Sequence, residues 1–322
     1  MGDSTAMMLE VSDLRKAYGR GEKRVVAADG IGFTADAASV LGILGPNGSG
    51  KTTTVKSCLG LVRRDGGSIR LAGADPEIER AAVLRVSGAV LEGARNVYWR
   101  LTTLENMHYF AALRGLRWKD VRARVDELLT MLGMEDRATA EVGKLSRGYQ
   151  QRCAIACALV HDPQVVFLDE PTLGLDVESR HAIEQSVRRW AAGGRLVVVT
   201  SHDMGFIERS CDRALVIRSG RIVAQGTVRG LMHSLVKHTL ALTFHEDSNP
   251  EITPLLHDRG ARLDSSGGAP VLTVPLDHPA DAETVLASLG GQKSLLAGLA
   301  VRDNDFETVF LQLLRDDEEV QS

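Results

Sequence analysis

The residues with the clearest chemical potential form one short glycine-rich segment. In order they are Gly45, Pro46, Asn47, Gly48, Ser49, Gly50, Lys51, Thr52 and Thr53. Glycines at this spacing let backbone N–H groups point inward at phosphates, and a helix that starts here adds its positive end. Lys51 would place a charge at the β- and γ-phosphates, and the Thr52 hydroxyl would be a ligand for Mg²⁺. The segment predicts that the chain binds a nucleoside triphosphate; the alternative is a chance glycine-rich turn.

Two acids follow an apolar stretch at residues 165–168. An aspartate such as Asp169, at a strand end beside a phosphate-binding loop, can hold Mg²⁺ through water. Glu170 could then polarise the attacking water as general base, an effect of about 10²–10⁴-fold. Apolar strands often end in acids, so the pair alone is a weak signal. The Pro-Thr-Leu-Gly-Leu-Asp segment at 171–176 strengthens the interpretation.

A histidine, His202, follows a second apolar stretch at residues 196–200. A lone histidine after a strand is usually a satisfied polar cap. Its position beyond a second central strand nevertheless makes a contact with a γ-phosphate geometrically sensible.

Elements that could position these residues alternate along residues 9–230. Short, continuous, β-branched strands alternate with helical stretches, which predicts an α/β fold with a mainly parallel central sheet. Residues 40–44 form the strand that enters the glycine-rich segment, and 53–61 the helix that leaves it. Residues 215–217 and 221–223 flank Ser219-Gly220 as a hairpin. Apolar residues at helical spacing indicate a helical insert at about 93–160.

From about residue 235 the pattern starts again, so we expect two domains, 1–232 and 233–322. In the second domain we expect strand 238–244, helix 250–258, strands 261–263 and 271–274, helix 279–289 and strand 295–301. This β-α-β-β-α-β order predicts a small α+β domain of ferredoxin-like pattern.

Composition limits the class of protein. The 322 residues are 44% hydrophobic and 25% charged, as in soluble globular proteins, and the net charge of −4 argues against nucleic acid as the main partner. Cys58, Cys153, Cys157 and Cys211 show no metal-binding spacing and fit a reducing cytoplasm, as buried small hydrophobes. Since no apolar run is long enough to span a bilayer, any membrane role is expected to come through a partner.

The order of these motifs, from Tyr18 to His202, resembles the nucleotide-binding subunit of ATP-binding-cassette (ABC) transporters. Residues 145–152, Leu-Ser-Arg-Gly-Tyr-Gln-Gln-Arg, are similar to the signature peptide of that family. The Leu-Glu-Gly-x-Arg-Asn-x-Tyr-Trp stretch at 91–99 is similar to subunits that export drugs, polysaccharides or lipids. The resemblance implies a P-loop nucleotide hydrolase fold of ABC type, with ATP and Mg²⁺ as cofactors.

The resemblance also implies roles for residues outside the glycine-rich segment. Tyr18 would stack on the adenine, although without this context it would be an ordinary strand aromatic. Ser146, Arg147 and Gly148 would bind the ATP held by a second subunit, with Ser146 and Gly148 at its γ-phosphate. Asp176 would lie at the interface of the two subunits, and His202 would sense the γ-phosphate.

Three departures from the family pattern stand out. Glu92 occupies the place of a glutamine that reaches Mg²⁺; it keeps an oxygen ligand for the metal but adds negative charge near the phosphates. Arg147 and Tyr149 replace the commonest residues of the signature. Ala38-Ser39 replaces a Gly-Glu turn.

Residues 94–100 resemble the groove that receives a coupling helix of the membrane subunit. Exposed Tyr98, Trp99 and Arg100 would suit an interface anchor; the alternative is that Tyr98 and Trp99 pack in the core of the helical insert. The segment 305–311 resembles a short closing helix of exporter subunits.

These observations favour an ATP-hydrolysing motor for export, which we expect to be a homodimer bound to a separate multi-span permease on the cytoplasmic face of the membrane. An import motor with a C-terminal regulatory domain is one alternative. A non-transport ABC ATPase is another, although no coiled-coil heptads or zinc spacing support it. A third is a sensor in which Glu92 has damaged catalysis.

Overall fold

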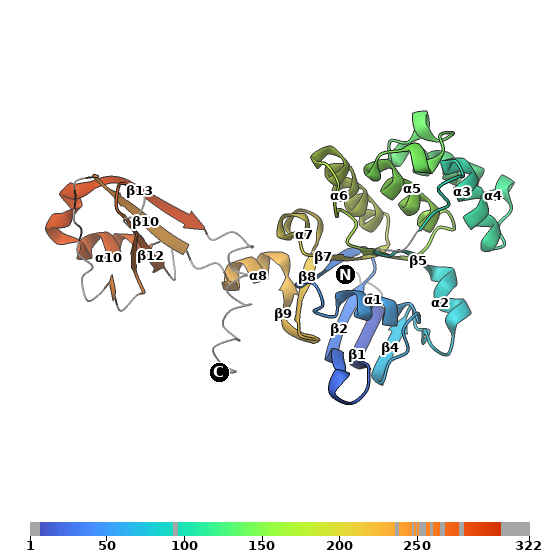
Figure 1. The fold of residues 1–322 in the computed structure, drawn as a ribbon, viewed down its shortest axis with the longest axis horizontal. Helices are drawn as coiled ribbons and strands as arrows, with labels where there is room; N and C mark the ends of the chain where they lie inside the picture. The colour runs from blue at the N-terminus through green and yellow to red at the C-terminus, as the bar shows by residue number, and fades with distance from the viewer. Residues whose placement is uncertain are drawn as a thin grey trace, which may run out of the picture. The chain divides into compact units, whose positions relative to one another are not determined.

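The computed structural model describes residues 7–92, 96–235, 238–246, 248, 250, 256–257, 260–264, 268–276 and 280–303. The chain divides into two compact units, residues 1–231 and 232–322. Figure 1 draws the first from blue to yellow and the second from orange to red.

A six-stranded sheet forms the centre of the first unit. Its strands lie in the order β5-β6-β7-β3-β8-β9. Neighbours pair in parallel except β8 and β9, which form the predicted antiparallel hairpin. The strands are β3 (Ser39–Leu44), β5 (Ser87–Val90), β6 (Val165–Asp169), β7 (Leu196–Ser201), β8 (Arg213–Arg218) and β9 (Arg221–Thr227). Every residue of β6 and β7 is buried, which explains their unbroken apolar sequence.

A second, antiparallel sheet packs in the same unit, and the sequence did not predict it as separate. Its order is β2-β1-β4, with β1 at Met7–Tyr18, β2 at Val25–Asp36 and β4 at Gly66–Leu71. Apolar side chains of both sheets belong to one core, which also includes Val55 and Cys58 of the helix after β3. The helix between the sheets is thereby fixed on two sides.

Figure 1 labels the helices, of which α1 lies between the two sheets. They are α1 (Lys51–Cys58), α2 (Arg80–Val86), α3 (Thr103–Leu113), α4 (Trp118–Met131), α5 (Arg147–Leu159), α6 (Val177–Ala192), α7 (Met204–Ser210) and α8 (Val228–Leu235). Within the described residues the first unit also contains the short 3₁₀ turns η1 (Gly21–Lys23), η2 (Glu135–Arg137) and η3 (Val142–Lys144), and the second unit contains η4 (Gly290–Leu295). Helix α3 starts with a capping box of Thr102 and Glu105, and α5, α6 and α7 start with side-chain caps from Ser146, Asp176 and Asp203.

The second unit contains a four-stranded antiparallel sheet in the order β11-β12-β10-β13. The strands are β10 (His238–Phe244), β11 (Arg262–Asp264), β12 (Val271–Leu276) and β13 (Leu296–Asp303), and helix α10 spans Asp281–Ser288. Alternate residues of β12 are buried against α10, as the period of a half-buried strand requires. Most of the predicted helix 250–258, and all of the predicted segment 305–311, lie outside the described residues.

Candidate functional site

The glycine-rich segment joins the buried strand β3 to α1 and lines a pocket. The pocket has a volume of about 320 Å³ and is bounded by Ala27, Asn47, Gly48, Ser49, Gly50, Lys51, Thr52, Thr53 and Glu92. Only glycine fits at position 50, because its φ is +111° and a Cβ atom there would lie 2.1 Å from the backbone oxygen of Ala27. Helix α1 begins one residue later, so its first N–H groups face this pocket.

Lys51 is held at the base of the loop. Its Nζ donates to the backbone oxygens of Gly45 at 2.7 Å and Pro46 at 3.3 Å, and lies 3.5 Å from Oε1 of Glu170. Only 6% of Lys51 is exposed. The loop therefore holds a single, nearly buried positive charge beside its glycines.

Asp169, the last residue of β6, contacts Thr52 of α1. The Thr52 hydroxyl donates to Oδ1 of Asp169 at 3.2 Å. Asp169 is 2% exposed, and its Oδ2 atom is buried without a hydrogen-bond partner among the described residues. A buried carboxylate oxygen with no donor is costly unless a cation or ligand satisfies it.

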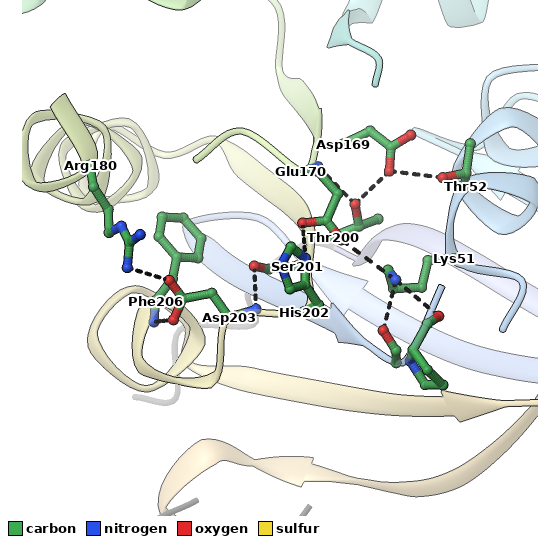
Figure 2. A network of polar contacts seen from close by, with 12 residues as sticks. Lys51, Thr52, Asp169, Glu170, Arg180, Thr200, Ser201, His202, Asp203 and Phe206 are labelled. Atoms are coloured by element: carbon green, nitrogen blue, oxygen red, sulfur yellow. Dashed lines mark hydrogen bonds and ion pairs between the residues drawn. The ribbon is translucent and has the colours of Figure 1, made fainter. Parts of the chain in front are cut away.

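Glu170 and His202 form the second half of the site (Figure 2). Oε2 of Glu170 lies 2.8 Å from Nδ1 of His202, while Oε1 faces Lys51 and accepts no hydrogen bond from the described residues. His202 comes from the loop after β7, and about half of its side chain is exposed. Glu170 has a φ of +51°, a left-handed conformation that is rare for a residue with a Cβ atom. Such strain often occurs where a site needs a side chain aimed in one direction.

Thr200 joins the two acids, and the sequence did not identify it. Strands β6 and β7 pair so that Asp169 lies opposite Thr200. The Thr200 hydroxyl donates to Oδ1 of Asp169 at 2.5 Å and accepts from the backbone N–H of Glu170 at 3.0 Å (Figure 2). The hydroxyl at the end of a buried apolar strand was a signal in the sequence, but its meaning depends on the pairing of the two strands.

The other predicted binding residues lie apart from the pocket lining. Ser146 caps α5, and a Cβ atom on Gly148 would lie 2.1 Å from the hydroxyl oxygen of Ser179, so the start of α5 packs closely on the start of α6. Asp176 caps α6; hydrogen bonds from the Ser179 amide, then from its hydroxyl, lower the pKa of Asp176. Arg147 is exposed, and its Nη1 atom lies beside Gly174.

Tyr18 also lies outside the pocket lining. It ends β1, is 43% exposed, and the Nζ atom of Lys16 lies 5.4 Å from its ring centroid. An exposed ring face of this kind is available for stacking.

Comparisons with known proteins identify the family. The sequence pattern described as ABC transporter matches residues 28–173. A Nod factor export ATP-binding protein I of Ralstonia nicotianae is 35% identical over 320 residues, covering 97% of this chain and 95% of that protein. The chain belongs to the ABC transporter family. It is the ATP-binding subunit of such a transporter and an ATP hydrolase.

Two further ABC proteins are similar to this chain. The ABC transporter ATP-binding protein NatA of Bacillus subtilis is 33% identical, covering 70% of this chain and 92% of that protein. A solved dimeric ABC cassette in a post-hydrolysis state, bound to ADP and Pi, matches with a TM-score of 0.62 and 26% identity. It covers 69% of this chain and 100% of that one. The predicted P-loop ABC fold is thereby confirmed.

The residues around the pocket at the glycine-rich segment fit a magnesium ion. Mg²⁺ prefers oxygen ligands and is usually shared between one or two carboxylates and the phosphates. The unpartnered Oδ2 of Asp169 and the Thr52 hydroxyl next to it supply such oxygens, and the exposed Glu92 borders the same pocket. Among the described residues, no group of three or more His, Cys, Asp or Glu side chains could hold a metal ion by itself.

A second pocket has a volume of about 1150 Å³ and lies at the edge of the helical insert. Its lining includes Asn96, Tyr98, Trp99, Phe110 and Lys144. Tyr98 is 50% and Trp99 51% exposed, so neither residue is buried, and the Tyr98 ring contacts the edge of Tyr109 in α3 with 4.8 Å between the ring centroids. Ala94 and Arg95 of the same predicted segment lie outside the described residues. None of the described helices is both long and apolar enough to cross a membrane.

Proposed function

We propose that this ABC subunit hydrolyses ATP with Glu170 as general base, and that hydrolysis powers export through a separate membrane permease. The observation that best supports the first part is the position of the Glu170 carboxyl group. It is nearly buried, it lies between Lys51 and His202, and one of its oxygens has no donor among the described residues. A water beside that oxygen could lose a proton to it while attacking a phosphate.

The roles of the other residues follow from their positions. Backbone N–H groups of residues 45–53 would bind the phosphates, and Lys51 would exchange its contacts with Gly45 and Pro46 for the β- and γ-phosphates. His202, held by Glu170, would donate to the γ-phosphate. Tyr18 would stack on the adenine.

Thr52, Asp169 and Glu92 would hold Mg²⁺. When bound, the ion neutralises negative charge that develops on the phosphates. Thr200 fixes Oδ1 of Asp169 and leaves Oδ2 for the ion. Glu92 adds a carboxylate to this set, so we expect binding of Mg²⁺ and ATP to depend on its charge.

The site is proposed to be complete only in a dimer. Ser146, Arg147 and Gly148 do not line the pocket of their own chain, and the solved cassette with ADP and Pi is dimeric. We infer that they cover the ATP of a second copy, with Asp176 at the interface.

Export is supported by the relatives rather than by the pocket. The relative named for Nod factor export matches nearly the full length of this chain, including the C-terminal unit. That unit is therefore no argument for an import motor. We propose a drug, lipid or polysaccharide-like cargo, and a peripheral position on the cytoplasmic face of the membrane, with Tyr98 and Trp99 as anchors for the permease.

The hydrolysis proposal is tested with Glu170→Gln and Lys51→Ala. Glu170→Gln should bind ATP, lose about 10²–10⁴-fold in kcat and accumulate an ATP-bound dimer, measured by light scattering after size exclusion. Lys51→Ala should lose ATP binding in calorimetry. Glu10→Gln, the same change at an exposed position of β1, is the control. Normal turnover by Glu170→Gln would refute the assignment of the base.

The transport proposal is tested by co-expression with a candidate multi-span permease, sought first in the reading frames next to the gene for this chain. The two should co-purify, and the Tyr98→Ala/Trp99→Ala variant should reduce recovery while the ATPase rate of the free subunit stays unchanged. Ile78→Ala, at an apolar position that is 80% exposed, is the matched control. Equal recovery of all three proteins would remove the anchor role.

A further inference from the structure

The residue after His202 is fixed by three separate contacts. The backbone N–H of Asp203 donates to the Ser201 hydroxyl at 2.9 Å, and Oδ1 of Asp203 accepts from the N–H of Phe206 at 3.0 Å. Oδ2 of Asp203 accepts from Nη1 of Arg180 at 2.7 Å (Figure 2). The first two contacts are local to the loop and to the cap of α7. The third comes from a different helix.

Arg180 lies in the first turn of α6, the helix that Asp176 caps. The N–H of Arg180 donates to the backbone oxygen of Asp176 at 3.0 Å, so the two residues move as parts of one turn. The same turn contains Ser179, against which Gly148 packs. These contacts connect the start of α6 to Asp203 through Arg180, and Asp203 adjoins His202 in the sequence.

We propose that the Arg180–Asp203 ion pair is a positioning contact for ATP hydrolysis, which couples the start of α6 to the orientation of His202 against Glu170. This inference rests on the proposed function, because it gives His202 and Glu170 their roles in the reaction. Arg180 does not touch the pocket; it acts through the backbone of residues 202 and 203. Closure at the proposed dimer interface would thus align His202 in the same chain.

The exposure of the Arg180–Asp203 pair indicates that its main role is not to stabilise the fold. The Arg180 and Asp203 side chains are 38% and 24% exposed, and exposed ion pairs contribute little to folding. A nearby contact holds the two helices together more firmly: Nε and Nη2 of Arg209 in α7 both donate to Glu184 of α6, whose side chain is only 7% exposed.

A matched pair lies further along the same helix. Nη1 of Arg188 in α6 donates to Asp212, just beyond α7, at 2.8 Å, and both side chains are 45% exposed. This pair has the same residue types, but Asp212 lies ten residues beyond His202 in the sequence, and Nε of Arg188 also donates to the backbone oxygen of Arg209. It separates an effect on His202 from an effect on helix packing.

The test compares Arg180→Gln, Arg180→Lys, Asp203→Asn, the Arg180→Gln/Asp203→Asn double variant and Arg188→Gln in the full chain. Asparagine can still accept from the N–H of Phe206 through its Oδ1 atom, so Asp203→Asn keeps the cap of α7 while an uncharged NH2 group, which cannot accept, replaces the oxygen that faces Arg180. We expect kcat to fall roughly 5- to 10-fold in Arg180→Gln, in Asp203→Asn and, without further loss, in the double variant. The KM for ATP should stay within about twofold, Arg180→Lys should recover part of the rate, and Arg188→Gln should equal the wild type.

Two results would overturn the inference: a normal kcat in both Arg180→Gln and Asp203→Asn, or an equal loss in Arg188→Gln. His202→Ala distinguishes its failure from that of the proposed function. If His202→Ala keeps the full kcat, the role assigned to His202 is wrong. If His202→Ala loses activity while Arg180→Gln and Asp203→Asn do not, only the positioning role is wrong. In the His202→Ala background, Arg180→Gln should cause no additional loss.

Discussion

Thr200→Val tests whether the two acids of the site depend on one buried hydroxyl. Valine keeps the shape of threonine but removes both hydrogen bonds of the Thr200 side chain. Asp169 would lose its 2.5 Å donor and keep the weaker contact from Thr52 at 3.2 Å. The N–H of Glu170 would keep its bond of 3.1 Å to the backbone oxygen of Thr200. The net loss is therefore one hydrogen bond to a buried carboxylate.

A hydrogen bond to a charged group contributes about 1.5–3 kcal/mol, so Thr200→Val should lower the free energy of unfolding by about 2 kcal/mol. The kcat for ATP should fall about tenfold, because about 1.4 kcal/mol of lost alignment of Asp169 and Glu170 gives that factor. Urea denaturation followed by circular dichroism measures the first quantity, and a coupled phosphate-release assay the second.

Thr54→Val is the control for stability. Thr54 is equally buried, but its hydroxyl donates to the backbone oxygen of Gly50, which also accepts from the N–H of Thr54. That oxygen keeps a donor in the variant, so the loss should be below about 1 kcal/mol. Equal losses for Thr200→Val and Thr54→Val would refute the special role of Thr200.

Three other variants test separate features. Gly148→Ala should displace Ser179 and lower kcat about 10- to 100-fold. The Gly148→Ala/Ser179→Gly double variant should recover much of the lost kcat. An unchanged kcat in Gly148→Ala would contradict the close packing. Burial, then the charge of Arg114, lowers the pKa of His161 to about 4. Since the unfolded chain then binds more protons, stability should fall as the pH drops from about 6.5 towards 4, by about 1–2 kcal/mol at pH 5 after discounting for partial exposure. His161→Gln should remove this fall in urea titrations at pH 7.5 and 5. Ala38 has a φ of +55°, so Ala38→Gly should raise the unfolding free energy by about 0.5–1 kcal/mol, and a lower urea midpoint would disprove this.

The parts of the site that the sequence predicted are those made by neighbouring residues. Residues 45–53 follow a buried strand and begin a helix, and Asp169 and Glu170 stand at the end of another buried strand. Both groups could therefore be recognised from neighbouring residues in the sequence. Thr200 and Ala27 reach the site only through pairing and packing with distant segments. No local pattern encodes such pairing, and for this reason they were missed.

The same distinction applies to the fold. The parallel strands were predicted because their unbroken apolar sequences require burial on both faces. The separation of β1, β2 and β4 into an antiparallel sheet was not, because it depends on the register between Leu9 and Leu71, sixty-two positions apart by their numbering. The order of strands and helices along the second unit was predicted more completely, since β12 shows the alternation of a half-buried strand and helix α10 follows it as expected.

The left-handed backbone of Glu170 has a consequence for attempts to stabilise this protein. A glycine at this position would relieve a conformational penalty of roughly 1 kcal/mol, but it would also remove the carboxylate beside the nearly buried Lys51, which costs about 3–5 kcal/mol. A stabilisation scheme that replaces left-handed residues by glycine should therefore leave position 170 unchanged.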